Sequence, residues 1–228
     1  MYSKSNFKEK MKVLNKSQVN TYLDCPLKWH KIYVEGIKSK PSLAQKRGIN
    51  IHKKIENFYR EPKADIDLKH FIKFELTRVR DMIKAKKFDR KYFYPLFQEL
   101  TLYNEEIGLK GTCDAIFINP KDDGLIMIDW KTGKHYGKGL DNYKLELCVY
   151  AELVNHSGKT DEKVKYIGIY FTDLNELYFE EIKQEDIDKM YEIVNEVREE
   201  MERGNFEPTE NEWCFNCQFK RECPLFKK

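Results

Sequence analysis

The sequence predicts an α/β fold in which helices accompany a mixed sheet (α+β mixed sheet) within one chain of 228 residues. Apolar residues recur every three to four positions near both ends of the chain, as is typical of amphipathic helices. In the middle, short apolar runs rich in β-branched and aromatic residues alternate with turn residues, as is typical of strands. Hydrophobic residues make up 41% and charged residues 35% of the chain, so it can bury a core and still have a polar surface.

Three helices are expected ahead of the strands. Ser17 is expected to be the N-cap of the first helix, which Cys25-Pro26 interrupts. The second helix opens at Pro41-Ser42, carries His52 on its apolar face and ends before Pro62. The expected inward residues are Val19, Tyr22 and Leu23 in the first helix, and Leu68, Ile72, Leu76, Val79 and Ile83 in the third, which spans Leu68–Lys86.

Strands dominate the rest of the chain, and the first three are expected to form an antiparallel meander with short turns. In chain order, the expected elements are strands at Leu96–Tyr103, Leu109–Ile118 and Leu125–Lys131, a helix at Asp141–Asn155, strands at Lys163–Phe171 and Glu176–Ile182, and a helix at Gln184–Arg203. The apolar centre of the fourth strand indicates that it is buried, whereas the fifth strand has the composition of an outer strand.

Two carboxylates and a lysine accompany the apolar runs of neighbouring strands. Asp114 precedes one apolar run, and Asp129 ends the next. Side chains alternate along a strand, so Asp129 and Lys131 share one face. Two carboxylates and one ammonium group suit a divalent metal ion that activates water beside an anionic phosphodiester. The simpler interpretation is a pair of surface acids that flank a hairpin turn at Asn119–Gly124.

Three motifs resemble those of the RecB-like branch of the PD-(D/E)XK nuclease superfamily. Gly48–Glu56 resembles the helical motif of that branch, Gly111–Asp114 its G-x-x-D motif, and Asp129–Thr132 its D-x-K-T motif. The chain is also similar to the iron–sulfur members of the branch, which include CRISPR-adaptation exonucleases, the AddB-type helicase–nuclease subunit and phage exonucleases. The resemblance extends from Ser17 to Pro224.

The resemblance implies a single RecB-like nuclease domain over residues 1–228, with a restriction-endonuclease-like PD-(D/E)XK core. A helical region over residues 17–90 would precede the catalytic sheet core at residues 95–182. A C-terminal helix and an iron–sulfur tail would cover residues 184–228. The length of the chain also fits one domain of mixed architecture.

The resemblance also implies roles for the motif residues. His52, Asp114 and Asp129 would bind Mn²⁺ or Mg²⁺ together with the peptide carbonyl of Trp130. Taken alone, His52 would be interpreted as a hydrogen-bonded core histidine. Lys131 would be catalytic in one of two ways that the residues do not separate. Its ammonium group could position the attacking water and stabilise negative charge, or burial near the metal could lower its pKa enough for it to help deprotonate that water.

Three further acidic or aromatic residues match positions of that branch. Glu99 could bind metal through water or orient Lys131. The branch also has a Q-x-x-x-Y motif, whose counterparts here are Glu146 and Tyr150, spaced i, i+4 on one helix face. Tyr150 fits the pattern. Glu146 departs from it because a carboxylate cannot donate a hydrogen bond as an amide can, so Glu146 could be turned away, paired with a lysine or an extra metal ligand.

Four of the six cysteines have the spacing of a metal or cluster site, with one early residue and a late C-x2-C-x5-C group: Cys25, Cys214, Cys217 and Cys223. Four thiolates can hold either a [4Fe–4S] cluster or Zn²⁺. The resemblance favours the [4Fe–4S] cluster, which would join the N-terminal helix to the C-terminus. Cys113 and Cys148 lie inside apolar segments and are expected to be small core residues.

The expected function is a metal-dependent DNA exonuclease that hydrolyses phosphodiester bonds from the ends of single-stranded DNA. Two alternatives stay open: a non-catalytic DNA-binding or end-processing scaffold, which the departure at Glu146 favours, and a restriction-type endonuclease. DNA is the expected partner, and a homo-oligomer or a helicase, recombination or CRISPR-adaptation partner is compatible with the residues.

The chain is expected in the cytoplasm, or in the host cytoplasm if it is viral. No apolar run approaches the ~20 residues that cross a membrane, and the first residues lack the apolar core of a secretory signal. Disulfides are uncommon in that compartment, which favours metal or cluster binding by the spaced cysteines.

Overall fold

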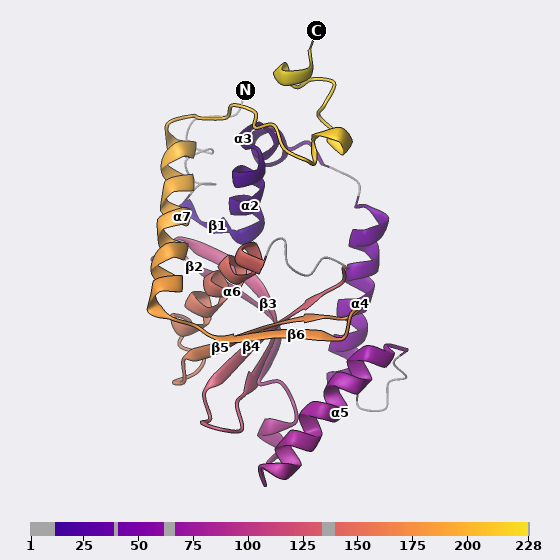
Figure 1. Ribbon diagram of the computed structural model, residues 1–228. Helices are drawn as coiled ribbons and strands as arrows, with labels where there is room; N and C mark the ends of the chain where they lie inside the picture. The colour runs from indigo at the N-terminus through magenta and orange to yellow at the C-terminus, as the bar shows by residue number, and fades with distance from the viewer. Residues whose placement is uncertain (1–11, 39–40, 62–66, 134–139, 228) are drawn as a thin grey trace. The chain divides into compact units, whose positions relative to one another are not determined.

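The structure, a computed structural model, describes residues 12–38, 41–61, 67–133 and 140–227 (Figure 1). The described residues form two compact units. The larger unit contains residues 41–103 and 111–187, and the smaller unit contains residues 1–40, 104–110 and 188–228 where they are described.

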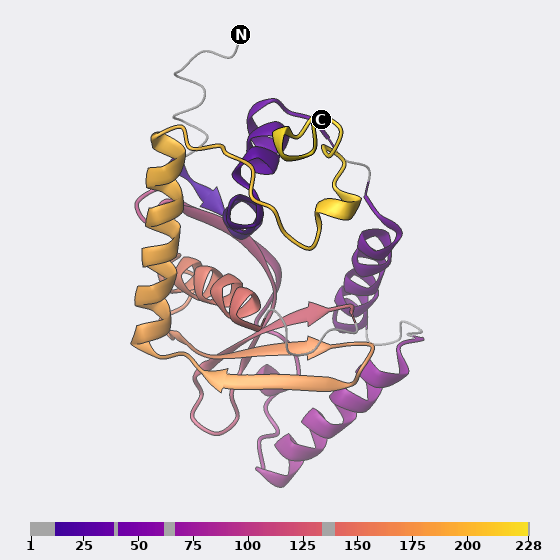
Figure 2. The same ribbon diagram turned by 45° about the horizontal axis from the view of Figure 1, so that its top comes forward.

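A mixed sheet is the centre of the larger unit. Its strands are β2 (Phe97–Asn104), β3 (Leu109–Ile118), β4 (Leu125–Lys131), β5 (Val164–Phe171) and β6 (Glu176–Glu181). β2 pairs with β3, β3 is antiparallel to β4, β4 is parallel to β5, and β5 is antiparallel to β6. Figure 2 shows β5 and β6 as adjacent arrows that point in opposite directions. This sheet with its helices confirms the predicted α/β fold class.

The connections between strands follow from their directions. β3 and β4 are antiparallel, so a tight turn joins them, in which the Asn119 N–H donates to the Gly124 carbonyl at 2.7 Å. β4 and β5 are parallel, so the chain must cross over between them, and α6 (Leu140–Asn155) lies in that crossover. The crossover brings α6 into contact with β4 and β5.

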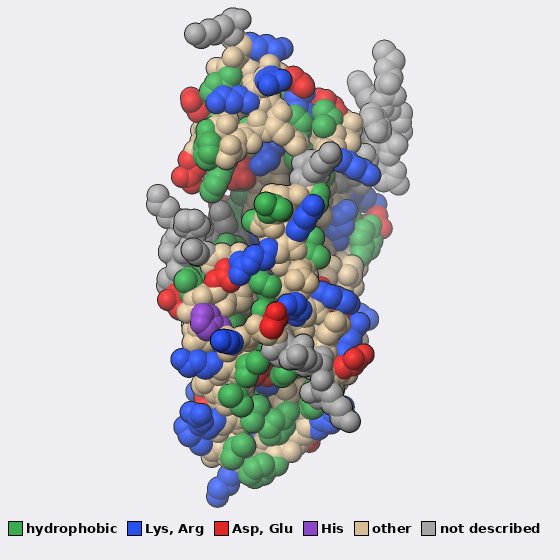
Figure 3. Space-filling model, turned by 90° about the vertical axis from the view of Figure 1, so that its right-hand side faces the viewer, with side chains coloured by type: hydrophobic (Ala, Val, Ile, Leu, Met, Phe, Trp, Pro, Cys, Tyr) green, Lys and Arg blue, Asp and Glu red, His purple; other side chains and the backbone are tan. Residues whose placement is uncertain are grey.

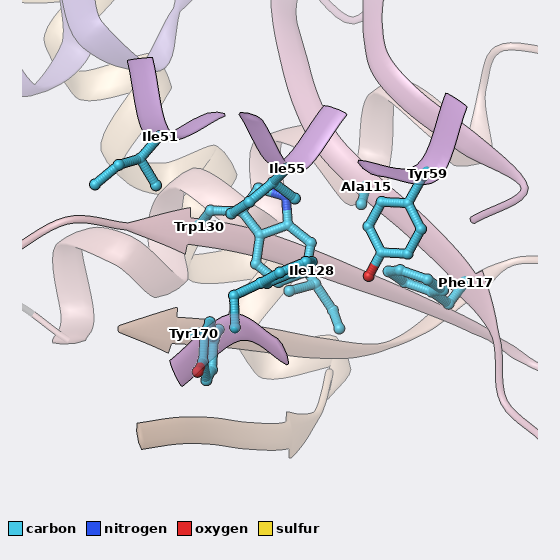
Figure 4. Packing of buried hydrophobic residues seen from close by; sticks show 9 residues of the cluster. Ile51, Ile55, Tyr59, Ala115, Phe117, Ile128, Trp130 and Tyr170 are labelled. Atoms are coloured by element: carbon cyan, nitrogen blue, oxygen red, sulfur yellow. The ribbon is translucent and has the colours of Figure 1, made fainter. Parts of the chain in front are cut away.

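The main core of the larger unit lies between α4 (Leu43–Arg60), α5 (Lys69–Lys84) and one face of the sheet (Figure 4). Ile51, Ile55 and Tyr59 are spaced by four residues and therefore project from one face of α4. They pack against the ring of Phe71 in α5 and against side chains that alternate along β3, β4 and β5. These strand residues are Ala115, Phe117, Ile128, Trp130 and Tyr170. Burial of these apolar groups is the main favourable contribution to folding of this unit.

The start of α4 is stabilised by a reciprocal capping box. The Ser42 hydroxyl accepts a hydrogen bond from the Gln45 N–H at 3.2 Å, and the Gln45 side chain accepts one from the Ser42 N–H at 2.8 Å. Two backbone donors of the first turn are thereby satisfied. The predicted opening of this helix at Pro41-Ser42 is confirmed.

The predicted inward face of α5 is confirmed for Leu68 and Ile72, which pack against the core, and is wrong for Leu76 and Ile83. Leu76 and Ile83 are 60% and 52% exposed, whereas Phe71, Glu75 and Met82 are buried. The true inward face includes a charged residue, which the apolar pattern does not reveal. Glu75 can be buried because Arg78 binds it with two hydrogen bonds, at 2.9 and 2.8 Å.

Arg78 also ties α5 to the next segment. Its guanidinium group donates to the carbonyls of Tyr92 and Phe93 at 2.9 and 2.6 Å, at the end of the 3₁₀ helix η2 (Arg90–Tyr92). The guanidinium carbon lies 4.7 Å from the centroid of the Phe117 ring. The Glu75–Arg78 pair therefore links α5, η2 and β3 through one buried cation.

The smaller unit contains both ends of the described chain. Its elements are β1 (Leu14–Asn15), α2 (Lys16–Asp24), α3 (Pro26–Trp29), the π-helical η1 (His30–Val34), most of α7 (Gln184–Glu202), and the 3₁₀ turns η3 (Cys214–Asn216) and η4 (Pro224–Phe226). β1 pairs in parallel with Leu109 and Lys110, the first residues of β3.

Asn15, rather than the predicted Ser17, is the N-cap of α2. The Asn15 side chain accepts a hydrogen bond from the Gln18 N–H at 2.8 Å, and the Gln18 side chain accepts one from the Asn15 N–H at 3.0 Å. Val19 and Tyr22 are buried as predicted, but Leu23 is 48% exposed. The amide residue Asn15 forms the complete capping box two positions before the hydroxyl residue Ser17.

Aromatic packing holds the C-terminal tail beside the first helices within the smaller unit, as Figure 2 shows for the tail and α3. The Trp29 ring stacks on the Phe206 ring with centroids 5.8 Å apart, and the Tyr22 hydroxyl donates to the Asn205 carbonyl. These contacts join segments that are far apart in sequence. None of the helices in the described ranges is long and apolar enough to cross a membrane.

We expect Phe71→Ala to lower the free energy of unfolding by about 3–5 kcal/mol, because it removes a ring from the centre of the core. Leu76→Ala is the matched control on the same helix and should change it by less than about 0.5 kcal/mol, because Leu76 is exposed. Denaturant unfolding of both variants measures the difference. A larger loss for Leu76→Ala would mean that the sequence-predicted face of α5 is the buried one.

Candidate active site

The candidate site forms where β3 separates from β4. The paired residues of the two strands end at Ala115 and Ile128. Beyond this pair, the Trp130 N–H donates to Oδ2 of Asp114 at 2.8 Å. The Asp114 side chain therefore satisfies a backbone donor that the strand ladder leaves, and its other oxygen faces away from the ladder.

His52 and Glu99 meet Asp114 at this point. His52 Nδ1 lies 3.3 Å from Asp114 Oδ1, and the side chain of His52 is 28% exposed. One ligand atom from each of His52, Glu99 and Asp114 lies within 4.8 Å of the others, and these three form the one such group among the described residues. An imidazole and two carboxylates form a donor set that suits Mn²⁺ and related divalent ions.

The backbone of Glu99 has an unusual conformation. Glu99 lies inside β2 with φ of 45°, in the left-handed region that non-glycine residues rarely adopt. Strained residues of this kind persist where the surrounding structure requires them, often at functional sites. The conformation accompanies a side chain whose carboxylate lies with His52 and Asp114.

A second group of charged side chains extends from β4 to α6. Lys131 Nζ lies 2.7 Å from Asp129 Oδ2 and donates to Glu146 Oε2 at 3.0 Å. The Tyr150 hydroxyl donates to Glu146 Oε1 at 3.0 Å. Asp129 and Glu146 are almost fully buried, and Lys131 is 21% exposed. Asp129 and Lys131 share a strand face, as predicted, and that face meets α6.

The contacts of Glu146 distinguish among the three options that the sequence leaves open for it. The side chain is paired with Lys131 rather than turned away from the site. Both of its oxygens accept hydrogen bonds, one from Lys131 and one from Tyr150. A glutamine has one carbonyl oxygen and an amide group that donates, so it could not accept both bonds through separate oxygens.

Gly111 of the G-x-x-D motif leaves room for the Tyr150 ring. A Cβ atom at Gly111 would lie 2.4 Å from Tyr150 Cε1 and 2.8 Å from Cδ1, which is closer than nonbonded carbon atoms can approach. The ring therefore packs directly against the β3 backbone. This contact positions the Tyr150 hydroxyl for its hydrogen bond to Glu146.

Acidic side chains gather at the site and shift one another's pKa values. Burial raises the pKa of Asp129 to about 7, although the Lys131 ammonium lowers it in part. Burial also raises the pKa of Glu99, and the charge of Asp114 adds to this. The carboxylates of Glu99, Asp114, Asp129 and Glu146 lie near the cations of Lys131 and His52, and a divalent cation would reduce their mutual repulsion.

The neighbouring carboxylates also shift the pKa values of the two basic groups, His52 and Lys131. Burial lowers the pKa of His52, but the hydrogen bond to Asp114, the charges of Asp114 and Asp129, and a hydrogen bond with the Trp130 backbone raise it to about 9 overall. Burial also opposes the charge of Lys131, but Asp129 and Glu146 more than offset it and raise its pKa. The carboxylates thus stabilise the ammonium form of Lys131.

A cavity of about 320 Å³ opens over this constellation, lined by His52, Trp130, Lys131, Thr132, Gly133, Tyr143 and Phe171. Sequence reasoning missed Tyr143. Its spacing from Glu146 and Tyr150 is i, i+3 and i+7, which places the three side chains on one face of α6. That spacing is the signal that could have revealed it.

The cysteines fall into two classes. All six are free thiols. Cys113 and Cys148 are buried in the larger unit, and burial raises the pKa of each thiol to about 12, which disfavours the thiolate that a metal requires. The remaining four lie in the smaller unit: Cys25, Cys214, Cys217 and Cys223.

Polar contacts bring the two cysteine-bearing segments of the smaller unit together. The Asn211 side chain donates to the Asp24 carbonyl at 2.8 Å, and the Asn211 N–H donates to Cys214 Sγ at 3.4 Å. One asparagine therefore joins the residue before Cys25 to the first cysteine of the tail. Lys31 and Glu222, the residue before Cys223, form an ion pair at 2.9 Å.

We expect Gly111→Ala to lower the free energy of unfolding by about 1–3 kcal/mol, because the new methyl group overlaps the Tyr150 ring. The same change in a Tyr150→Ala background should cost much less, so the two substitutions should be strongly non-additive. Gly133→Ala is the control, because its Cβ would meet no atom within 4 Å. Equal costs of Gly111→Ala in both backgrounds would contradict the packing argument.

Comparison with known proteins identifies the fold and the family of the chain. A solved structure, of a proposed exonuclease from Eubacterium rectale, has the same fold, with a TM-score of 0.57 and 13% sequence identity, and the match covers 100% of this chain and 95% of that one. No curated protein matches the sequence. The family profile described as the PD-(D/E)XK nuclease superfamily matches residues 13–224, nearly the whole chain. The chain therefore belongs to the PD-(D/E)XK nuclease superfamily.

Proposed function

We propose that this nuclease is a metal-dependent DNA exonuclease that hydrolyses phosphodiester bonds at the ends of single-stranded DNA. The observation that carries the proposal is the juxtaposition of a three-residue donor group, His52, Glu99 and Asp114, with the Asp129–Lys131 pair at the end of β4. The similarity in fold to the proposed exonuclease from Eubacterium rectale supports it.

His52, Glu99 and Asp114 would hold Mn²⁺ or Mg²⁺, with Asp129 and the Trp130 carbonyl as further ligands. The donor set fits such an ion because carboxylate oxygens and one imidazole converge within 4.8 Å of one another. When bound, the metal supplies Lewis-acid polarisation of a phosphoryl oxygen and activation of water. Asp114 orients toward that position because the Trp130 amide fixes its second oxygen.

Lys131 would act as a fixed positive charge. Its Nζ is held between Asp129 and Glu146, at 2.7 and 3.0 Å, and both partners favour the ammonium form. An ammonium group in that position can orient the scissile phosphate and stabilise the charge that develops on it. Of the two roles left open by the sequence, this geometry favours charge stabilisation.

The surface charge of the larger unit suits a polyanion. Figure 3 shows many Lys and Arg side chains on the side of the molecule that carries α4 and α5. Exposed cations on these two helices include Lys46, Lys53, Lys69, Lys73 and Arg80. Such residues attract the phosphate backbone without reading its sequence, in keeping with an enzyme that digests DNA of any sequence.

Cys25, Cys214, Cys217 and Cys223 would hold a structural [4Fe–4S] cluster. The free thiols and the contacts of Asn211 and Lys31, which bring the two cysteine-bearing segments together, fit this group. The cluster would join Cys25, which follows α2, to the three cysteines of the tail through covalent bonds to iron. It would act on stability rather than on the reaction, because its ligands and the metal donors belong to different compact units.

We expect wild-type protein with Mn²⁺ or Mg²⁺ to shorten an end-labelled single-stranded oligonucleotide progressively, and EDTA to abolish this. Lys131→Ala should lower the rate by about 10²-fold or more, because it removes the charge beside the scissile phosphate. Lys159→Ala, at an exposed loop lysine of the same unit, is the matched control and should keep full activity. Gel analysis of 5′- and 3′-labelled substrates gives the rates and the direction of digestion.

Circular single-stranded DNA separates the proposal from its alternatives. An exonuclease leaves a closed circle intact, so cutting of the circle would instead support an endonuclease. Tight DNA binding without cleavage under either metal would support a non-catalytic scaffold.

We expect Cys217→Ala to remove the visible absorbance of the iron–sulfur cluster, its iron and its acid-labile sulfide, and to lower the melting temperature. Cys148→Ala is the matched control, since this buried core thiol should leave the iron content unchanged. Metal analysis of protein purified without oxygen measures both. Colourless wild-type protein that contains stoichiometric zinc would contradict the cluster.

A further inference from the structure

We propose that Tyr143 is a stacking platform for the nucleobase of the nucleotide at the scissile phosphate, and that this contact selects unpaired nucleotides. The inference rests on the proposed nuclease function and names a residue outside the motifs that identify the family. Tyr143 would recognise a base that can leave its stack, whereas the candidate metal ligands and Lys131 would act on the phosphate.

Tyr143 is held in a defined place beside Lys131. Its ring centroid lies 5.1 Å from Lys131 Nζ. On another side, the ring of Phe171 packs against it edge to face, with centroids 6.0 Å apart and an angle of 69°. Phe171 is 1% exposed and belongs to β5, so it is a rigid support for the tyrosine ring.

The cavity offers complementary chemistry to the two parts of a nucleotide. Lys131 lies in its wall and suits a phosphate, whereas the partly exposed Tyr143 ring in the same wall is the aromatic surface that a neutral, planar base can stack on. Because the ring lies about 5 Å from the ammonium group, one nucleotide can contact both. Stacking tolerates all four bases, as a general exonuclease requires.

The other aromatic residues of the site cannot take this role. Tyr150 packs against the Gly111 backbone and its hydroxyl binds Glu146. Trp130 and Phe171 are 2% and 1% exposed, so their faces are covered by the core. Among the Phe, Tyr and Trp residues described in the lining of the cavity, Tyr143 is thus the one whose ring is partly exposed.

Base stacking on Tyr143 would make single-stranded DNA the better substrate. A base within a duplex is paired and stacked on its neighbours, and it must leave both interactions before it can lie on a protein ring. An unpaired terminal base leaves more easily. The preference for single strands would therefore arise at the reacting nucleotide rather than from the surface charge of α4 and α5.

A protein–substrate double-mutant cycle tests this inference. We expect Tyr143→Ala to lower kcat/KM on single-stranded DNA by about tenfold or more, because the stacking contact is lost, and Tyr143→Phe to stay within about threefold of wild type. On an oligonucleotide whose terminal nucleotides are abasic, wild type and Tyr143→Ala should be equally slow, because no base is present to stack. Tyr103→Ala, which removes an exposed tyrosine of β2, is the control.

Two results would overturn the proposal. One is an equal loss for Tyr143→Ala on natural and abasic DNA, which would indicate that the ring only supports Lys131. The other is a Tyr143→Ala variant that has the melting temperature of the wild type and digests natural DNA at the wild-type rate.

Binding in EDTA separates this inference from the nuclease assignment. A terminal 2-aminopurine loses fluorescence when it stacks on an aromatic ring, so wild type should quench it and Tyr143→Ala should not. If wild type quenches the probe but cleaves no DNA under any metal, the stacking site stands and the nuclease function fails. Cleavage without any Tyr143-dependent quenching would support the nuclease function and contradict the role of Tyr143 in base stacking.

Discussion

The separation of β3 from β4, closed by the bond from the Trp130 amide to Asp114, is the constraint on which the site depends. An unpaired buried amide would cost about as much as a lost hydrogen bond, so the carboxylate that satisfies it is held in place. The indole of Trp130 packs edge to face on the rings of Phe71 and Tyr170 in the core. Core packing on one side of β4 thereby sets the position of Asp114, a candidate metal ligand on β3.

Charge is the second organising feature. Asp129 and Glu146 are nearly buried, and both are close to Lys131, while Glu99 and Asp114 lie with His52. Buried carboxylates are tolerated when cations or hydrogen-bond donors face them, and here Lys131 lies between the two buried acids, Asp129 and Glu146. A divalent ion would complete this balance. The same arrangement explains why the site is assembled on strands and helices rather than on loops, since repelling groups must be held by a rigid scaffold.

α6 links the parts of the site through one of its faces. Tyr143, Glu146 and Tyr150 follow each other at i, i+3 and i+7, and each has a different neighbour: Phe171, Lys131 and Gly111 respectively. The crossover that a parallel β4–β5 pair requires places this helix against the end of β4. Topology therefore brings an aromatic ring, a carboxylate and a hydroxyl to the lysine, and Glu146 keeps its position by accepting two hydrogen bonds in place of the family's glutamine.

Strand positions and motif residues could be predicted from the sequence because they depend on local patterns. The bounds of β3 and β4 agree with the alternation of apolar residues, and Asp114, Asp129 and Lys131 follow from spacing along those strands. Other features depend on partners distant in the chain. The inward face of α5 holds Glu75 because Arg78 neutralises it. Glu99 combines a left-handed φ with a side chain that lies near His52. Tyr143 is recognised as part of the site only from its contacts with Phe171 and Lys131. Local periodicity reports which face of an element is apolar, whereas burial of charge, backbone strain and the meeting of side chains from separate elements are decided by the tertiary structure.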